Sequence, residues 1–406
     1  MRNKPRIRFK GFTEDWEQRK LLTVLNKIVD YRGRTPKKLG LDWSSTGHLA
    51  LSALNVKMGY IDKTVDAHYG DDYLYSVWMK DNDLYEGQVL FTTEAPMGNV
   101  AQVPDDNKYI LSQRTIAFVP DRSVISDNFL AVVLSASKCQ KSLTNRASGG
   151  TAKGVSQKTL SEISLDIPQS FSEQDKVSEL IKKLSKVITL HQRKLEKLKL
   201  AKKALLQKLF PKNGSQFPEI RFKGFTDAWE QRKFDEIMTF INGRAYKQDE
   251  LLSDGKYKVL RVGNFYTNDS WYYSNLELDD KYYAMNGDLL YTWSATFGPH
   301  IWKGEKVIYH YHIWKIVLKN KIDKLFALQL LEVDKANIMS DKNGSTMVHI
   351  TKQGMENKKT ILPLSLNEQK QISKFLSSID KLITLHQRKL DKLQDVKKGL
   401  LQKMFV

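Results

Sequence analysis

Residue types that can carry catalysis occur throughout this sequence, but none stands at a catalytic spacing. The segment GGTAKGVS at residues 149–156 has the glycines, lysine and serine of a phosphate-binding loop, yet it does not match GxxxxGK[ST]. An HExxH motif and a cysteine–histidine cluster suited to zinc are both missing. So are a nucleophile elbow and the [DN]PP[YF] signature of amino-methyltransferases, and no carboxylate pair is singled out by spacing. We therefore predict a chain with no catalytic or metal site of its own.

The charge of the chain points instead to a polyanionic partner. The formal net charge is +19, and 18 of these excess positive charges lie in residues 1–20, 172–210, 211–233 and 367–406. The intervening residues 21–171 and 234–366 are almost neutral. A strongly basic balance is typical of proteins that bind nucleic acid or another polyanion. A solvated, lysine-rich helix surface would give the same balance, so this alternative stays open.

Two repeated motifs show that the chain is duplicated. ITLHQRKL occupies residues 188–195 and again 383–390, while GFTEDWEQRK at 11–20 returns as GFTDAWEQRK at 224–233. A repeat of about 200 residues excludes a solenoid built from short units. The ends of the two halves are nearly identical, whereas their middles have diverged. The sequence therefore predicts two different surfaces on one shared frame.

The segments 172–210 and 367–406 have the heptad spacing of long paired helices. Apolar residues recur at alternating steps of four and three, with no proline inside, and each segment starts with a polar SEQ or NEQ triplet. We expect the two helices to pair with each other; heptads alone leave the direction open. The polar seam positions, which include Lys202 and Lys397, are interpreted as register devices or partner contacts. The predicted seam consists of Ile181, Leu184, Ile188, His191, Leu195 and Leu198 with Leu376, Ile379, Ile383, His386, Leu390 and Leu393.

The two middles are predicted to share one mixed α/β fold. Short apolar runs bounded by turn residues predict strands at 48–56, 88–92, 114–119, 257–262, 288–293 and 312–318. Each middle also has one plausible helix, at 126–137 and 321–334. The segments 87–98 and 287–298 align without gaps, as do 149–168 and 344–363. The common fold with divergent surfaces fits the duplication.

Cysteine content and apolar runs indicate the cellular location expected for the chain. The single cysteine, Cys139, excludes an internal disulfide framework and is predicted to be a small buried thiol. The longest apolar run, at about 129–136, is far shorter than a membrane helix, and no apolar segment follows the basic N-terminus as in a signal peptide. We expect a cytoplasmic protein with no membrane contact.

Taken together, these motifs resemble the specificity (S) subunits of type I restriction-modification systems. The resemblance covers the whole chain: the openings RFKGFTEDWE (8–17) and RFKGFTDAWE (221–230), the joints IPQSFSEQ (167–174) and LPLSLNEQ (362–369), and the helices after HQRKL. It implies a mixed α/β (α+β) fold with two similar target recognition domains, separated by two long helices that pair as an antiparallel coiled coil with a pseudo-twofold internal repeat.

The resemblance also implies a function. Each recognition domain would read one half of an asymmetric bipartite site in double-stranded DNA, and the helices would set the spacing and dock two methyltransferase (M) subunits. Restriction (R) subunits would join the full complex. The chain itself would catalyse nothing and hold no cofactor, since S-adenosylmethionine, ATP and Mg would belong to the partner subunits.

The expected organisation follows from the same resemblance. Short repeat segments occupy 1–20 and 211–233, the latter with a linker. Recognition domains span 21–171 and 234–366, and the helices span 172–210 and 367–406.

Side chains suited to base edges or phosphates occur on matching loops of both middles. Arginine and lysine favour guanine, asparagine and glutamine favour adenine, and loops on a rigid scaffold present them well. Gly33-Arg34 matches Gly243-Arg244, and Gly149 matches Gly344. The tryptophans 293, 302 and 314 could stack on bases, but core packing is favoured. The DNA-binding candidates are Arg32, Arg34, Lys37, Lys38, Gln113, Arg114, Arg146 and Lys153, and then Arg244, Tyr246, Lys247, Lys342, Asn343 and Lys352.

Two other classes of function remain as alternatives. A coiled-coil adaptor could use its helices to recruit partners and its variable middles to bind proteins. A stand-alone DNA-modifying enzyme would require activity from the purified chain, which the missing motifs make remote.

Overall fold

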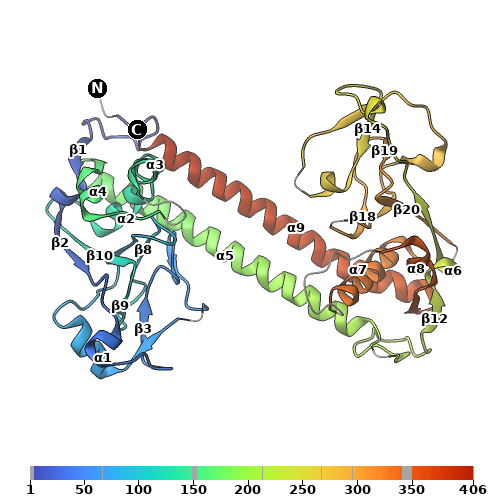
Figure 1. Cartoon of the computed structure of the whole chain (residues 1–406), viewed down its shortest axis with the longest axis horizontal. Coiled ribbons are helices and arrows are strands. Elements are labelled where there is room, and N and C mark those ends of the chain that lie inside the picture. Colours follow the sequence, from blue (N-terminus) through green and yellow to red (C-terminus); the bar gives the residue numbers. More distant parts are fainter. Residues whose placement is uncertain are drawn as a thin grey trace. The chain divides into compact units, whose positions relative to one another are not determined.

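The structure, a computed structural model, describes residues 4–65, 67–148, 153–212, 214–266, 268–294, 296–319, 321–340 and 350–405. The chain forms two compact units (Figure 1). Unit 1 joins the residues up to Arg193 to those from Gln387 onward, and unit 2 spans Lys194–His386. Each unit contains one diverged middle, named here variable region 1 (21–171) and variable region 2 (234–366). Each also contains a segment of both long helices, α5 (Phe171–Leu209) and α9 (Leu366–Lys403).

Variable region 1 is built on a four-stranded antiparallel sheet in the order β2-β10-β7-β8. Its strands are β2 (Leu25–Asp30), β10 (Thr115–Pro120), β7 (Val89–Thr92) and β8 (Val100–Gln102). A smaller sheet, β6-β3-β9, packs beside it, and its strands are β6 (Tyr69–Gly70), β3 (His48–Leu51) and β9 (Ile110–Leu111). The hairpin β4–β5 (Val56–Lys57 and Tyr60–Ile61) adjoins β8. The helices are α1 (Asp72–Met79), α2 (Asp127–Ser135), α3 (Ser137–Arg146) and α4 (Gln157–Glu162).

Variable region 2 repeats this plan with different additions. Its main sheet, β13-β20-β17-β18, consists of Met238–Asn242, Ile313–Leu318, Leu289–Thr292 and Gly298–Ile301. Its second sheet, β15-β14-β19-β16, consists of Tyr272–Ser274, Tyr257–Leu260, Val307–Tyr309 and Tyr283–Ala284. Both second sheets contain one parallel pair, β3 with β9 and β14 with β19. The helices are α6 (Phe234–Ile237), α7 (Lys324–Ser340) and α8 (Lys352–Asn357). The predicted common mixed fold is thus confirmed.

The short repeats act as strands that join each variable region to its own long helix. The sequence EQRK forms β1 (Glu17–Lys20) in one unit and β12 (Glu230–Lys233) in the other. β1 pairs with β11 (Ser164–Ile167), and β12 pairs with β21 (Lys359–Leu362), in equivalent antiparallel registers. Since β11 and β21 immediately precede α5 and α9, each short repeat is fixed beside a helix start.

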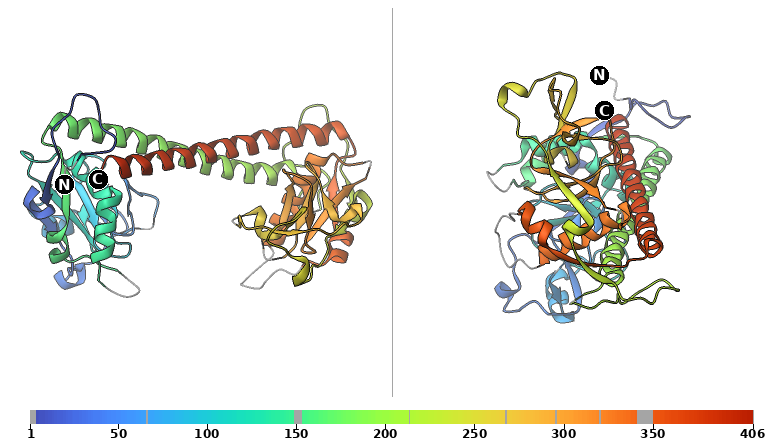
Figure 2. Two further views of the ribbon diagram at one scale, coloured as in Figure 1. Left: turned by 90° about the horizontal axis from the view of Figure 1, so that it is seen from above. Right: turned by 90° about the vertical axis from the view of Figure 1, so that its right-hand side faces the viewer.

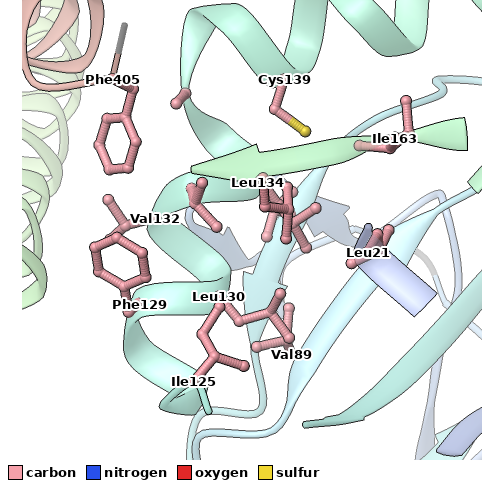
Figure 3. Packing of buried hydrophobic residues seen from close by; sticks show 14 of the residues in the cluster. Leu21, Val89, Ile125, Phe129, Leu130, Val132, Leu134, Cys139, Ile163 and Phe405 are labelled. Carbon is pink, nitrogen blue, oxygen red and sulfur yellow. The ribbon is translucent and has the colours of Figure 1, made fainter. Parts of the chain in front are cut away.

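One aromatic triad recurs in the core of each unit. In unit 1, Trp16 of the short repeat, Phe129 of α2 and Phe405 beyond α9 have ring centroids 5.5–5.8 Å apart. Figure 3 shows Phe129 and Phe405 next to each other. Trp229, Phe326 of α7 and Phe210 beyond α5 repeat the arrangement in unit 2, at 5.5–6.2 Å. Aromatic rings dominate core energetics through the large apolar area they bury. Repeat segment, variable region and helix end therefore share one core in each unit.

Cys139 of α3 lies among the buried hydrophobic residues of unit 1 (Figure 3). Its side chain is 3% exposed, and burial raises the pKa of its thiol to about 12. The prediction of a small buried thiol is confirmed.

The two long helices run antiparallel in both units and lie along one side of each α/β body (Figure 2). In unit 1, Val177 and Ile181 near the start of α5 share a core with Leu401 and Met404 near the end of α9. In unit 2 the reverse holds: residues at the end of α5 share a core with residues near the start of α9. The predicted antiparallel coiled coil is confirmed. None of the twelve predicted seam residues is exposed, whereas intervening residues such as Val187, Leu190, Leu382 and Leu385 are.

Each long helix carries in its first turn a Glu–Gln pair whose side chains are buried. Glu173 accepts two hydrogen bonds from the Arg8 guanidinium, at 2.7 and 2.8 Å, and Glu368 accepts the equivalent pair from Arg221, at 2.8 and 2.9 Å. Glu173 and Glu368 are each 1% exposed, so these bidentate ion pairs are protected from water. They fix the RFKGF segment of each repeat to the first turn of a long helix.

The neighbouring glutamine fixes the variable region to the same turn. The Gln174 side chain accepts from the Ser126 backbone N–H and donates to the carbonyls of Val124 and Pro168. In unit 2, Gln369 accepts from Asp323 and donates to Lys321 and Pro363. Both glutamines are fully buried, with every polar side-chain atom bonded. The starts of α2 and α7 are thereby tied to the starts of α5 and α9.

We predict that breaking the buried ion pair at either helix start strongly destabilises the unit that contains it. Glu368→Gln removes the charge opposite Arg221, and leaving a buried charge uncompensated costs about 3 kcal/mol or more. In calorimetry of the full chain, the transition of unit 2 should move down by on the order of 10 °C. As a control, Glu179→Gln in α5 breaks only the exposed pair with Lys183 and should leave the melting unchanged. Equal shifts for the two variants would contradict this account.

Candidate nucleic-acid interface

In variable region 1, the main sheet brings most of the predicted site loops together at one end. β2 ends at Asp30, which pairs with Ile116 at the start of β10, and Thr115 pairs with Thr92 at the end of β7. Because neighbouring strands are antiparallel, the loops 31–38, 93–99 and 113–114 all emerge at this same end. Gly154 bridges Glu94 and Ser148 there, which adds the segment 153–155.

Direct contacts join these loops to one another. The Arg32 guanidinium donates to the Asp30 carboxylate, with Nε–Oδ1 at 2.9 Å, and also to the Val155 carbonyl at 3.2 Å. The Gln113 side chain donates to the Arg34 carbonyl at 2.9 Å. Arg114 has a positive φ of 63° and pairs with Glu94 at 3.1 Å. Arg32 is therefore a structural link between loops, whereas Gln113 and Arg114 remain exposed at the sheet end.

A basic hollow of about 270 Å³ lies beside the first loop. Its lining includes three cationic side chains, from Arg34, Lys38 and Lys80, together with Gly33, Thr35, Leu39 and Val77. The Arg34 guanidinium lies 4.8 Å from the centre of the Tyr31 ring, and Lys38 Nζ donates to the Gly33 carbonyl. Lys37 is exposed on the same turn. Lys80 was missed by sequence reasoning because it follows α1, which only the fold brings next to this loop.

The two remaining candidates of this region flank residues 149–152, which lie outside the described part of the chain. Arg146, at the end of α3, donates to the Ser142 side chain at 2.7 Å and lies 3.6 Å from Glu162. Lys153 is exposed, next to the bridging Gly154. The structure therefore places Lys153 at the sheet end, with Arg146 two residues from the bridged Ser148.

The corresponding end of the main sheet in variable region 2 carries Arg244 on the loop after β13. Its guanidinium forms a bidentate pair with Glu250, at 2.7 and 2.9 Å, and lies 5.2 Å from the centre of the Tyr246 ring. Its backbone is bonded to Tyr309 and Tyr311. Hydrogen bonds from Arg244 hold the pKa of Glu250 down, at about 2. The pair therefore stays charged at neutral pH.

The other candidates of this region are placed less uniformly. Tyr246 is half-buried and packs against Val259, Tyr283 and Ile308, whereas Lys247 is exposed. Lys352 begins α8 and pairs with Glu356 one turn later, at 3.5 Å. Lys342 and Asn343 lie outside the described residues. The structure thus groups Arg244, Tyr246 and Lys247 and puts Lys352 on a separate helix.

An aromatic turn at this sheet end was missed by sequence reasoning. His310, Tyr311 and His312 have ring centroids 4.0–4.8 Å apart, and Trp293 lies 4.9 Å from His312. The Trp293 indole donates to the Tyr311 carbonyl, and Tyr311 is 39% exposed. The only sequence signal is HYH, whose last residue begins a predicted strand. Trp314 is core, as favoured from the sequence, at 1% exposed, while Trp293 and Trp302 are partly buried.

Histidines around this end are held neutral by their surroundings. Burial, with a smaller effect of Lys335, lowers the pKa of His300 to about 4. Burial, with His312 and Arg261, lowers the pKa of His310 to about 4 as well. At neutral pH these rings are hydrogen-bonding and stacking groups without charge.

Within the described residues, no group of three or more His, Cys, Asp or Glu side chains is placed to hold a metal ion. In the same part of the chain, no helix combines the length and apolar character needed to cross a lipid bilayer.

Comparison with known proteins identifies the family. The model of the type I restriction modification DNA specificity domain matches residues 13–200 and again residues 226–395. The chain belongs to this family. The two matches cover both repeats, so the duplication read from the sequence is a duplication of the family's domain.

Two relatives come from Methanocaldococcus jannaschii. The type I restriction enzyme MjaVIII specificity subunit is 31% identical over 193 residues, which are 47% of this chain and 44% of that protein. The match thus spans less than half the length of that relative. The putative type I restriction enzyme MjaX specificity subunit is 24% identical over 96% of this chain and 92% of its own length.

Solved structures share the fold. The S subunit of the type I restriction-modification system from M. genitalium has a TM-score of 0.66, with 14% identity and 99% of each chain covered. A chain from a structure on complex assembly and conformational transition of the type I R-M system has a TM-score of 0.52, with 18% identity, and covers 96% of this chain and 97% of its own length. The two-domain plan with long helices is thus the fold of this family.

We predict that unit 2 loses stability in mild acid because of its neutral histidines. His300 and His310 bind protons near pH 4 when folded, against about 6.5 when unfolded. The unfolded chain therefore takes up more protons between these values, and stability falls as the pH falls through this window. NMR titration should show no protonation of either ring above about pH 5.

A control variant separates this effect from general acid denaturation. His300→Phe keeps a ring against Phe265, whose centroid lies 4.2 Å away, but removes the titrating group. The melting temperature of unit 2 should then depend less steeply on pH. A His300 ring that titrates near 6.5 in the folded protein would refute the prediction.

Proposed function

We propose that this chain is the DNA-reading subunit of a type I restriction-modification complex, and that each variable region reads one half of an asymmetric bipartite site. One observation carries the proposal: equivalent ends of two equivalent sheets present different side chains. Two copies of one reader would favour a palindromic site, whereas two unlike readers on a shared frame suit a split, asymmetric one. The family membership supports this assignment.

The chemistry of the two sheet ends suits different base edges. Region 1 offers Arg34, Gln113 and Arg114, and such side chains form bidentate hydrogen bonds with guanine or adenine in the major groove. Region 2 pairs Arg244 with Glu250 and presents Lys247 and the exposed Tyr311. Tyrosine supplies a stacking or apolar surface in addition to its hydroxyl. We infer that the two halves of the target differ in sequence.

The frame would bind partners and phosphates. Exposed apolar residues on the outer faces of the long helices, which include Val187, Leu190, Leu382 and Leu385, suit docking of two methyltransferase subunits. Restriction subunits would join in the full complex. The length of α5 and α9 would set the gap between half-sites, and frame lysines would contribute salt-dependent affinity with a slope near 0.9 per phosphate.

In this assembly the chain performs recognition and no chemistry. S-adenosylmethionine, ATP and Mg would be bound by the partner subunits, and the complex would act on chromosomal DNA in the cytoplasm. The alternative of a coiled-coil adaptor has no observation of its own in its favour. The exposed helix faces that such an adaptor would use are the same faces proposed here to dock the methyltransferase subunits.

Region exchange tests the proposal. The chain would be co-expressed with its methyltransferase in a host free of adenine methylation, and the modified adenines mapped genome-wide. We expect one asymmetric motif in two parts with a fixed gap. Replacing residues 21–171 by those of another family member should change only one part and keep the gap. A continuous or palindromic motif, or a motif unchanged by the exchange, would overturn the proposal.

Single side chains in region 1 give a finer prediction. Replacing both Arg34 and Gln113 by alanine should relax the choice of base at one or two positions of one half-site, because each lost bidentate contact is worth about 1–3 kcal/mol of discrimination. The other half-site should be read as before. The measurement is methylation of a duplex library with every base varied in turn.

A charge control in the same region accompanies this pair. Lys63→Ala removes an exposed cation that pairs with Asp105 and lies against Tyr109, away from the loops after β2 and β7. Its base preferences should match the wild type. Relaxation of both half-sites by the Arg34 and Gln113 changes would point to general unfolding and refute their assignment.

A further inference from the structure

The two long helices carry equivalent lysines in unequal surroundings. Lys202 of α5 and Lys397 of α9 stand 195 residues apart, at the same place in the repeat. In unit 2, Lys202 Nζ lies 2.6 Å from an Asp380 oxygen, and the Gln329 side chain donates to the other oxygen at 3.2 Å. Lys202 therefore has a carboxylate partner that is itself held in place.

The position equivalent to Asp380 in the first repeat is Ser185. The Ser185 hydroxyl donates to the Ile181 carbonyl at 2.7 Å and offers no charge. Lys397 thus lacks the acid that its counterpart has. Within the described residues, its ammonium group takes part in no ion pair or hydrogen bond.

Lys397 is nevertheless half-buried in unit 1, beside the β4–β5 hairpin. A Cβ placed on Gly59, at the turn of that hairpin, would lie 3.9 Å from Lys397 Nζ. The hairpin is held by hydrogen bonds from Gly59 N–H to Val100 and from the Asn99 side chain to Val56. Asn99 ends the loop 93–99, which carries Glu94 and borders the candidate interface. The ammonium group therefore lies beside a hairpin that is hydrogen-bonded to the last residue of a loop at the candidate interface.

An unpaired cation in this place costs stability. Burial lowers the pKa of Lys397, which means that its surroundings disfavour the charged form. Either of two changes would remove this cost. A methionine in place of Lys397 would fill the same space without charge, and an aspartate in place of Ser185 would supply the ion pair found in unit 2. A buried charge without its partner is destabilising. A site that contains only the positive partner therefore suits a ligand that brings the negative charge.

We propose that Lys397 binds a backbone phosphate of DNA lying along variable region 1, and that Asp380 closes the equivalent position in unit 2. Lysine is a well-suited phosphate ligand as a compact point charge. DNA is favoured over an acidic protein because the hairpin beside the ammonium group is hydrogen-bonded to the loop 93–99 of the candidate interface. The inference rests on the function proposed above and adds to it that the frame contacts DNA unequally in its two halves.

Three variants test this inference in the complex with the methyltransferase subunits, on a duplex that carries the target site. Lys397→Met removes the charge, and Ser185→Asp neutralises it with the acid found in unit 2. Both should make the plot of log K against log salt shallower by about 0.9, the contribution of one phosphate contact. Lys202→Met is the matched control and should leave the slope unchanged.

Thermal stability provides a second readout with opposite signs. Lys397→Met should raise the melting temperature of unit 1, because it removes an uncompensated charge. Lys202→Met should lower that of unit 2, because it leaves Asp380 unpaired. If Lys397 had a purely structural role, Lys397→Met would instead lower the melting temperature of unit 1.

The outcomes distinguish this inference from the proposed function. Wild-type binding with unchanged slopes in both Lys397→Met and Ser185→Asp overturns the inference alone. Unchanged slopes together with loss of the methyltransferase subunits assign Lys397 to a protein contact and also overturn it. A wild-type complex that binds no DNA overturns the proposed function and the inference together.

Discussion

The architecture of this chain depends on the buried Glu–Gln pair that begins each long helix. The glutamate holds an arginine of the short repeat, and the glutamine holds two backbone segments of the variable region. Three elements far apart in sequence therefore meet in the first helical turn. Because these polar groups are buried, losing any partner leaves a charge or hydrogen-bonding group without water, which penalises other arrangements of the same parts.

This junction lets the variable regions diverge without losing their place on the frame. The fixed contacts involve the last strand of each region, which pairs with the short repeat before it (β11 with β1, β21 with β12), and the start of one helix in each region. The loops at the far end of the main sheet take no part in them. Such loops can change their side chains at little cost to the core, and recognition residues concentrate on loops of this kind. The charged frame is repeated because it makes the fixed contacts, and the neutral regions can diverge because their loops do not.

The two repeats differ in a few charged residues and in a few added helices and strands. Lys202 pairs with Asp380, whereas the residue equivalent to Asp380 in the first repeat is the uncharged Ser185. Likewise, α1 packs against β6 and β9 in region 1, whereas the described residues of region 2 form the 3-10 turn Asp280–Tyr282 and the extra strand β16 between β15 and β17. Equivalent backbones thus present different electrostatic surfaces. Symmetry of the frame does not require symmetry of what it contacts.

The sequence alone determined the duplication, the mixed fold, the long helices and the family, because each depends on local periodicity or on repeated motifs. It also located Arg34, Gln113 and Arg244 on loops after strands. Tertiary structure decided which of these residues are free to bind. It paired Arg32 with Asp30 and Arg244 with Glu250, brought Lys80 beside Lys38, and assembled His310, Tyr311 and Trp293. Packing brings Lys80 to Lys38 and Trp293 to His312, and no local pattern in the sequence encodes those distances. For the nearer ion pairs, the fold decides which side-chain conformations are possible.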